Sequence, residues 1–188
     1  MIREHLAKHV GSDRRIALVR GAELRPLEQF HDGKDVGQEV IVKDFPAATQ
    51  KGGDSPRDRY IRAQVASVAD VYGERFGQPV QLDAKLRFCV IPQFTLPRQW
   101  GMKSTPILIW FPEEYPLVAP NGFYLSKRCS GPHIFSRNVY GKSPDLSAQG
   151  WNWYCAHTSW KPGTDPLDGD TLWTFLDIAR MSLSIREF

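Results

Sequence analysis

The chain has 188 residues, of which 41% are hydrophobic, 12% aromatic and 24% charged, and its formal net charge is +3. This length and balance are typical of one folded globular unit and exclude a disordered or fibrous protein. The basic residues occur as scattered pairs such as Arg14 and Arg15 rather than as a long run, so the sequence does not favour nucleic acid as a partner.

The sequence contains no secretory hydrophobic segment, and no apolar run approaches the roughly 20 residues that cross a bilayer. We therefore expect a cytoplasmic protein without a membrane partner. The three cysteines have irregular spacing that does not form a disulfide framework. In a reducing compartment each is a thiol, either buried and inert or exposed and used in chemistry.

Residues 1–54 are polar and interrupted by glycines, and they contain two short β-like runs at 16–19 and 40–42. We interpret this part as an irregular N-terminal extension. It could be a partner-binding arm, an added edge to a sheet, or an autoinhibitory segment. A domain is expected to follow at 55–188.

A helix is predicted over 55–76. Ser55 is a suitable N-cap, Pro56 suits the first helical position, and Asp58 lies in the first turn, where the helix dipole favours an acidic side chain. Apolar residues then recur at helical spacing on one stripe: Ile61, Val65, Val68, Tyr72 and Phe76. Arg57, Arg59 and Arg62 lie off this stripe.

Four β-like segments follow the helix, at about 80–91, 93–97, 105–111 and 123–125. A helix followed by such a meander predicts an α+β domain with a four-stranded antiparallel sheet. Residues 126–161 show little periodicity and are expected to form a long structured loop that carries function. A C-terminal helix is predicted from about Leu172, with Thr171 or Asp170 near its start.

The segment 151–162 holds three of the six Trp and one of the three Cys. Within it a thiol, Cys155, stands two residues before an imidazole, His157. A thiolate is the nucleophilic form of cysteine, and imidazole titrates near neutral pH, so His157 could activate the thiol or act as a base. The alternative is a buried structural thiol beside a histidine that only hydrogen-bonds in a loop.

The stretch Phe111-Pro112-Glu113-Glu114-Tyr115-Pro116 resembles the signature of ubiquitin-conjugating enzymes, in which a third strand ends in Phe-Pro-x-x-Tyr-Pro. The order of the predicted elements is also similar to that family over about 55–185. The resemblance implies a UBC-like fold with an N-terminal helix, a four-stranded meander, an active-site loop and a C-terminal helix.

Within this resemblance Cys155 is similar to the cysteine that receives the C-terminus of a ubiquitin-like protein as a thioester, and Trp160-Lys161-Pro162 looks like the Trp-x-Pro that follows it. The family's His-Pro-Asn is absent, although Asn138 and the three residues after it look like its tail. The gap from Cys155 to Trp160 is also short.

These departures resemble the divergent prokaryotic branch, found beside bacterial activating enzymes, ubiquitin-like proteins and JAB-type peptidases in antiviral gene clusters. The resemblance implies a thioester transferase whose partners are a ubiquitin-like protein, an activating enzyme and a target protein, without a cofactor or metal.

Two amides are candidates for stabilising the oxyanion when an amine attacks the thioester. Asn138 has the resemblance to the family motif, and Asn152 lies close to Cys155 in the sequence. Either could instead close a turn through its own side chain. Three acidic residues, Asp165, Asp168 and Asp170, could orient an amine, although we favour a role in capping the C-terminal helix.

The remaining candidates concern partner binding. The resemblance makes Arg57, Arg59 and Arg62 a recruitment face for the activating enzyme, or else a merely solvated face. Trp151 and Trp153 could form a wall for the tail of a ubiquitin-like protein, or could be core, which we favour for Trp160 and Trp173.

Three other functions stay open. Cys129 and His133 together with Cys155 and His157 supply four zinc ligands, although at unusual spacing. A Cys-His hydrolase is a second alternative, weakened by the lack of an evident third orienting group. The third is a conjugating-fold scaffold that binds a ubiquitin-like protein without chemistry.

Overall fold

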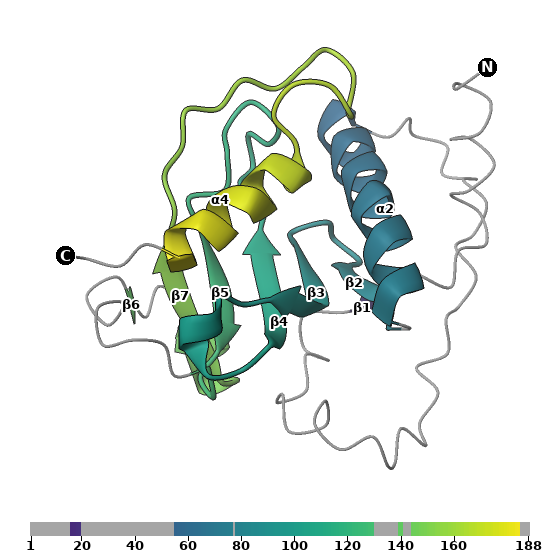
Figure 1. Ribbon diagram of the computed structural model, residues 1–188. Coiled ribbons are helices and arrows are strands. Elements are labelled where there is room, and N and C mark those ends of the chain that lie inside the picture. The colour runs from purple at the N-terminus through teal and green to yellow at the C-terminus, as the bar shows by residue number, and fades with distance from the viewer. Residues whose placement is uncertain (1–15, 20–54, 77, 130–138, 141–143, 185–188) are drawn as a thin grey trace.

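The computed structural model describes residues 16–19, 55–76, 78–129, 139–140 and 144–184. These residues form one sheet with two long helices against one of its faces (Figure 1). The helices are α2 (Pro56–Phe76), the short α3 (Pro144–Ala148) and α4 (Leu172–Ser184). The strands are β1 (Ile16–Val19), β2 (Val80–Asp83), β3 (Phe88–Thr95), β4 (Ser104–Trp110), β5 (Gly122–Ser126), β6 (Val139–Tyr140) and β7 (Trp151–Cys155).

The sheet has seven strands in the order β1-β2-β3-β4-β5-β7-β6. The prediction of a four-stranded sheet is therefore wrong in the number of strands. Five antiparallel strands, β2, β3, β4, β5 and β7, form its body. The short β6 extends it antiparallel to β7, and β1 pairs parallel to β2 at the other edge. The β-like run at 16–19 is thus an added edge strand, while the run at 40–42 lies outside the described residues.

The first predicted strand is wrong in its bounds, because a turn divides 80–91. Leu86 donates its backbone N–H to the carbonyl of Asp83 at 2.8 Å, and Arg87 donates from its guanidinium to the Asp83 carboxylate at 2.7 Å. β3 then continues through Pro92 to Thr95 with a register shift between Ile91 and Phe94. A bulge accommodates a proline, which has no N–H for the ladder.

The segment Trp151–Cys155, expected to lie in a loop, is instead the strand β7. It pairs with β5 on one side and β6 on the other. Side chains of this strand are buried on each of the two faces of the sheet. Its sequence therefore lacks the alternation of apolar and polar residues that marks a half-buried strand.

Both predicted helices are confirmed. Ser55 caps α2, since its hydroxyl accepts the N–H of Asp58 at 3.1 Å. Thr171 directly precedes α4, and its backbone N–H donates to the hydroxyl of Thr174 at 3.2 Å. No helix in the described part of the chain combines the length and the apolar character needed to cross a membrane.

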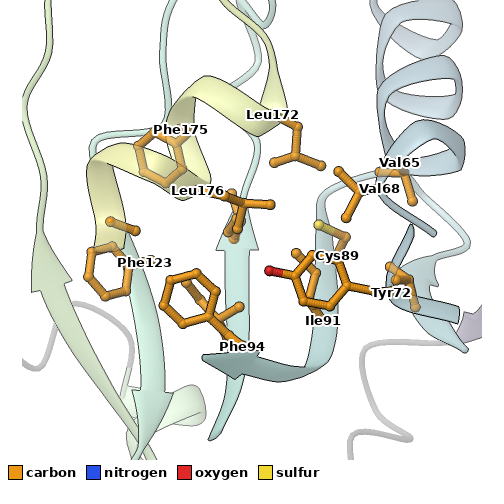
Figure 2. Packing of buried hydrophobic residues seen from close by; sticks show 14 of the residues in the cluster. Val65, Val68, Tyr72, Cys89, Ile91, Phe94, Phe123, Leu172, Phe175 and Leu176 are labelled. Carbon is orange, nitrogen blue, oxygen red and sulfur yellow. The ribbon is translucent and has the colours of Figure 1, made fainter. Parts of the chain in front are cut away.

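The main core lies between the helices and the inner face of the sheet. Figure 2 shows side chains from α2 and α4 directed toward those of the sheet, among them Val68, Leu176 and Ile91, which are fully buried. Burying one such side chain contributes about 1.5 to 3 kcal/mol. A second cluster lies on the outer face: Phe88, Val90, Leu108, Tyr124, Leu146, Trp151 and Trp153.

A buried amide joins the elements around the inner core. Gln64 of α2 is 1% exposed, and its Oε1 accepts the N–H of Leu172 at 2.9 Å and the hydroxyl of Tyr115. Its Nε2 donates to the carbonyl of Pro166 at 2.7 Å. One side chain therefore fixes α2 to the start of α4, to the loop at 161–170 and to the β4–β5 connection at 111–121.

We predict that Gln64→Met lowers the free energy of unfolding by about 2 to 4 kcal/mol, because it leaves a buried hydroxyl and a buried N–H without an acceptor. Urea denaturation measures this. The control is Gln81→Met, at a half-exposed position on β2, which should change stability by less than about 0.5 kcal/mol. Equal losses in the two variants would contradict the assigned network.

Candidate active site

Cys155 is the last residue of β7, at the end of the sheet where β5 begins. Its register partner on β5 is Gly122. The pairing continues for one more residue, since Ala156 donates its N–H to the carbonyl of Asn121 at 3.2 Å. The chain then leaves the sheet, so the thiol stands at the border between a paired strand and an irregular segment.

The structure brings Cys155 and His157 together. Their Sγ and Nε2 atoms are 2.8 Å apart. The imidazole is exposed, whereas the thiol is half-buried and packs against the outer cluster. This geometry allows the thiol proton to pass to the ring nitrogen and leave a thiolate, which is the attacking form.

The segment that carries His157, residues 156–160, is held to the β4–β5 connection at both ends. At its start is the bond between Ala156 and Asn121. At its end the indole Nε1 of Trp160 donates to the carbonyl of Pro116 at 2.7 Å. Trp160 also packs on Tyr115, with ring centroids 6.3 Å apart, and is partly buried against the inner core as expected.

The two candidate amides have different positions. Asn152 faces the inner side of the sheet, because it is three residues before Cys155 on the same strand and side chains alternate. The structure therefore separates it from the thiol. Asn138 lies outside the described residues, but it directly precedes Val139, which pairs with Tyr154. The chain thus enters β6 next to the cysteine end of β7.

Gly122 is a site residue that the sequence analysis did not single out. A Cβ at this position would lie 2.4 Å from the carbonyl of Tyr154 and 2.5 Å from the indole of Trp153. The indole therefore lies over β5 beside the thiol only because the register partner of Cys155 is a glycine. The sole signal in the sequence is a glycine at the start of a predicted strand.

The candidate wall of Trp151 and Trp153 is buried in the outer cluster, each side chain being 4% exposed. Of the arginines on α2, Arg57 is bound within the protein: its guanidinium donates to the carbonyls of Pro112 at 3.3 Å and Leu86 at 3.1 Å. Arg59 is exposed and Arg62 is half-buried.

The three acidic residues near Trp160 close a loop rather than cap α4. Asp170 accepts the N–H of Lys161 at 2.6 Å, and Asp165 accepts the N–H of Leu167 at 3.2 Å. Asp168 accepts the N–H of Gly163 through its backbone carbonyl at 3.0 Å. The residue directly before α4 is instead Thr171, whose backbone carbonyl accepts the N–H of Phe175 at 3.1 Å.

The zinc and hydrolase alternatives find no support among the described residues. Cys129 belongs to the inner core, whereas Cys155 packs on the outer face, so these two thiols do not share a site. His133 lies outside the described residues. No cluster of three or more potential ligands occurs in the described part. Nor does any described carboxylate or amide hydrogen-bond to His157 to complete a triad.

Burial distinguishes the other two thiols from Cys155. Cys89 and Cys129 are 0% and 3% exposed. Burial raises the pKa of each to about 12. Near neutral pH both are therefore protonated and inaccessible, which leaves Cys155 as the thiol available for reaction.

We predict that iodoacetamide modifies the native protein once per chain, at Cys155, and reaches three modifications only in denaturant. Intact-mass spectrometry over time measures the stoichiometry. Cys155→Ser should abolish the single native modification, while Cys129→Ser should preserve it. Rapid native modification of two or three thiols would contradict the assigned burial.

Comparison with protein families gives one match. The model described as prokaryotic E2 family E covers residues 76–184, which is more than half of the chain and includes β2 to α4. No curated protein and no solved structure matches. Proteins of this E2-like kind act as transferases in ubiquitin-like conjugation, with a ubiquitin-like protein and an activating enzyme as the general classes of partner. With Cys155 and the Phe-Pro-x-x-Tyr-Pro segment inside the matched residues, the chain belongs to the prokaryotic E2 family E.

Proposed function

We propose that this protein accepts a ubiquitin-like protein as a thioester on Cys155 and transfers it to an amine of a target protein, in antiviral defence. One observation carries the proposal. Among the three thiols, Cys155 alone stands at the end of a strand within 2.8 Å of an exposed imidazole, while the other two are buried. The antiviral setting follows from the resemblance to the prokaryotic branch described above.

The first step is an exchange of thioesters. The thiol proton of Cys155 moves to Nε2 of His157, and the thiolate attacks the thioester carbonyl that the activating enzyme carries. A new C–S bond forms at Cys155, and the C–S bond to the activating enzyme breaks. The departing thiolate takes up the proton, so the exchange needs no oxidant, reductant or metal.

The second step forms the amide. A lysine amine of the target attacks the thioester carbonyl on Cys155, and a C–N bond replaces the C–S bond. The amine loses one proton, for which neutral His157 is the nearest described base, and Cys155 returns as a thiol. Because a thiolate leaves easily, the demand on acid catalysis is small.

The negative charge on the carbonyl oxygen in this step would be stabilised by an amide donor. We assign this role to Asn138 rather than Asn152. Asn138 precedes the strand that pairs with β7 beside Cys155, whereas Asn152 faces the opposite side of the sheet.

Recruitment of the activating enzyme would use the exposed side of α2. Of the three candidate arginines, Arg59 is the most exposed, while Arg57 already binds two carbonyls of the protein itself. We therefore assign partner binding to Arg59 in the first place and a supporting role to Arg62. Trp151 and Trp153 would support the site from beneath rather than by direct contact with the tail.

We predict that incubation with ATP, the cognate activating enzyme and the cognate ubiquitin-like protein gives a covalent adduct that a thiol reductant removes. Cys155→Ala should give no adduct, and Cys155→Ser should give an ester that resists the reductant. Cys129→Ala is the matched control and should retain the adduct. Non-reducing gel electrophoresis measures all four. Binding without any adduct would favour the scaffold function instead.

We further predict that Asn138→Ala slows transfer from preformed thioester to free lysine by about 100-fold, since loss of one oxyanion donor has an effect of this order. Asn152→Ala should change this rate by less than about threefold, because the Asn152 side chain faces the side of the sheet opposite to Cys155. Single-turnover discharge assays separate this step from thioester formation. A larger loss in Asn152→Ala than in Asn138→Ala would reverse the assignment.

A further inference from the structure

The segment at 156–160 connects the strand with the cysteine to the loop at 161–170, and it has no regular secondary structure of its own. Within the segment, the hydroxyl of Thr158 donates to the carbonyl of Ser159 at 2.9 Å. In the described part of the protein, the hydrogen bonds that tie the segment to other elements are those of Ala156 and Trp160.

Both ties lead to one short stretch, Pro116 to Asn121. The residues just before this stretch are bound to α2, because Tyr115 is buried and hydrogen-bonds to Gln64, and because Arg57 donates to the carbonyl of Pro112. The two ends of the segment are therefore bound to the same short stretch, which follows directly after residues that are tied to α2. A five-residue segment with both ends fixed has few conformations, and its middle is held accordingly.

His157 lies between the two ties and needs such support. It is exposed, and in the described part of the protein its hydrogen bond is to Cys155 alone. An exposed side chain with one contact has no packing that fixes its backbone position. The 2.8 Å separation from the thiol then depends on where the segment as a whole is held.

We propose that Trp160 is a positioning residue for the reactive thiol. Its indole N–H, through the bond to the carbonyl of Pro116, holds the segment that keeps His157 against Cys155. The Trp160 ring also packs on Tyr115. The hydrogen bond of 2.7 Å is the more directional contact, because it holds the indole nitrogen at a fixed place relative to the Pro116 carbonyl. This inference rests on the proposed use of the Cys155–His157 pair.

The test uses the isolated full chain and iodoacetamide, so it needs no partner protein. We expect Trp160→Phe to slow alkylation of Cys155 at pH 7 by about five- to tenfold, the equivalent of one hydrogen bond of about 1 to 1.5 kcal/mol. His157→Ala should slow it to a similar extent. The double variant should be no slower than His157→Ala alone, because the indole acts only through the imidazole.

The matched control is Trp173→Phe. This Trp is also partly buried, and its Nε1 donates to the Ser67 hydroxyl at 3.1 Å between α4 and α2. The variant loses an indole hydrogen bond of the same kind in the helix layer, so it should reduce stability without slowing alkylation. Thermal unfolding of each variant compares the structural losses.

A second variant keeps the packing of the ring. Replacing Trp160 with benzothienylalanine retains a bicyclic side chain and substitutes sulfur for the N–H, so it should reproduce the slower alkylation even if the phenylalanine variant is unstable. Unchanged alkylation in this variant, additive losses in the double variant, or an equal loss in Trp173→Phe would each overturn the positioning role.

These outcomes are separate from the proposed function. If His157→Ala leaves alkylation unchanged, the inference about Trp160 fails, while the reductant-sensitive adduct on Cys155 still tests the thioester carrier. If the adduct never forms but the alkylation results are as expected, the positioning of His157 stands and the conjugation function fails.

Discussion

The buried amide of Gln64 is the interaction on which the arrangement of the site depends. It meets a hydroxyl, a backbone N–H and a backbone carbonyl from three segments that are distant in the sequence. A buried polar group without a partner is costly, so these segments are stable only when they meet at this position. The β4–β5 connection, the loop at 161–170 and the start of α4 are therefore placed relative to α2 together.

The position of the segment that follows Cys155 depends on this arrangement, because the segment is bound to the stretch from Pro116 to Asn121. This stretch holds both ends of the segment after the cysteine, and it begins next to Tyr115, which binds Gln64. The family match starts at residue 76, the last residue of α2. Gln64 and Arg57 lie before it, so residues outside the matched part fix the geometry of residues inside it.

The burial of each cysteine side chain decides which thiol is available for chemistry. Cys89 and Cys129 are both buried in the inner core, so their thiols stay protonated near neutral pH. Cys155 lies on the outer face at a strand end, where pairing stops and an exposed imidazole is adjacent. The same side chain is therefore inert or available according to its position in the fold.

The sequence by itself determined the features that depend on local signals. The cap at Ser55, the apolar stripe of α2 and the apolar periodicity of α4 act within a few residues. The tertiary structure alone decided the seven-stranded sheet, the strand at Trp151–Cys155, the engagement of Arg57 and the side of the sheet that Asn152 faces. These features depend on pairing and burial between residues far apart in the chain, and neither leaves a periodic pattern in a short window of sequence.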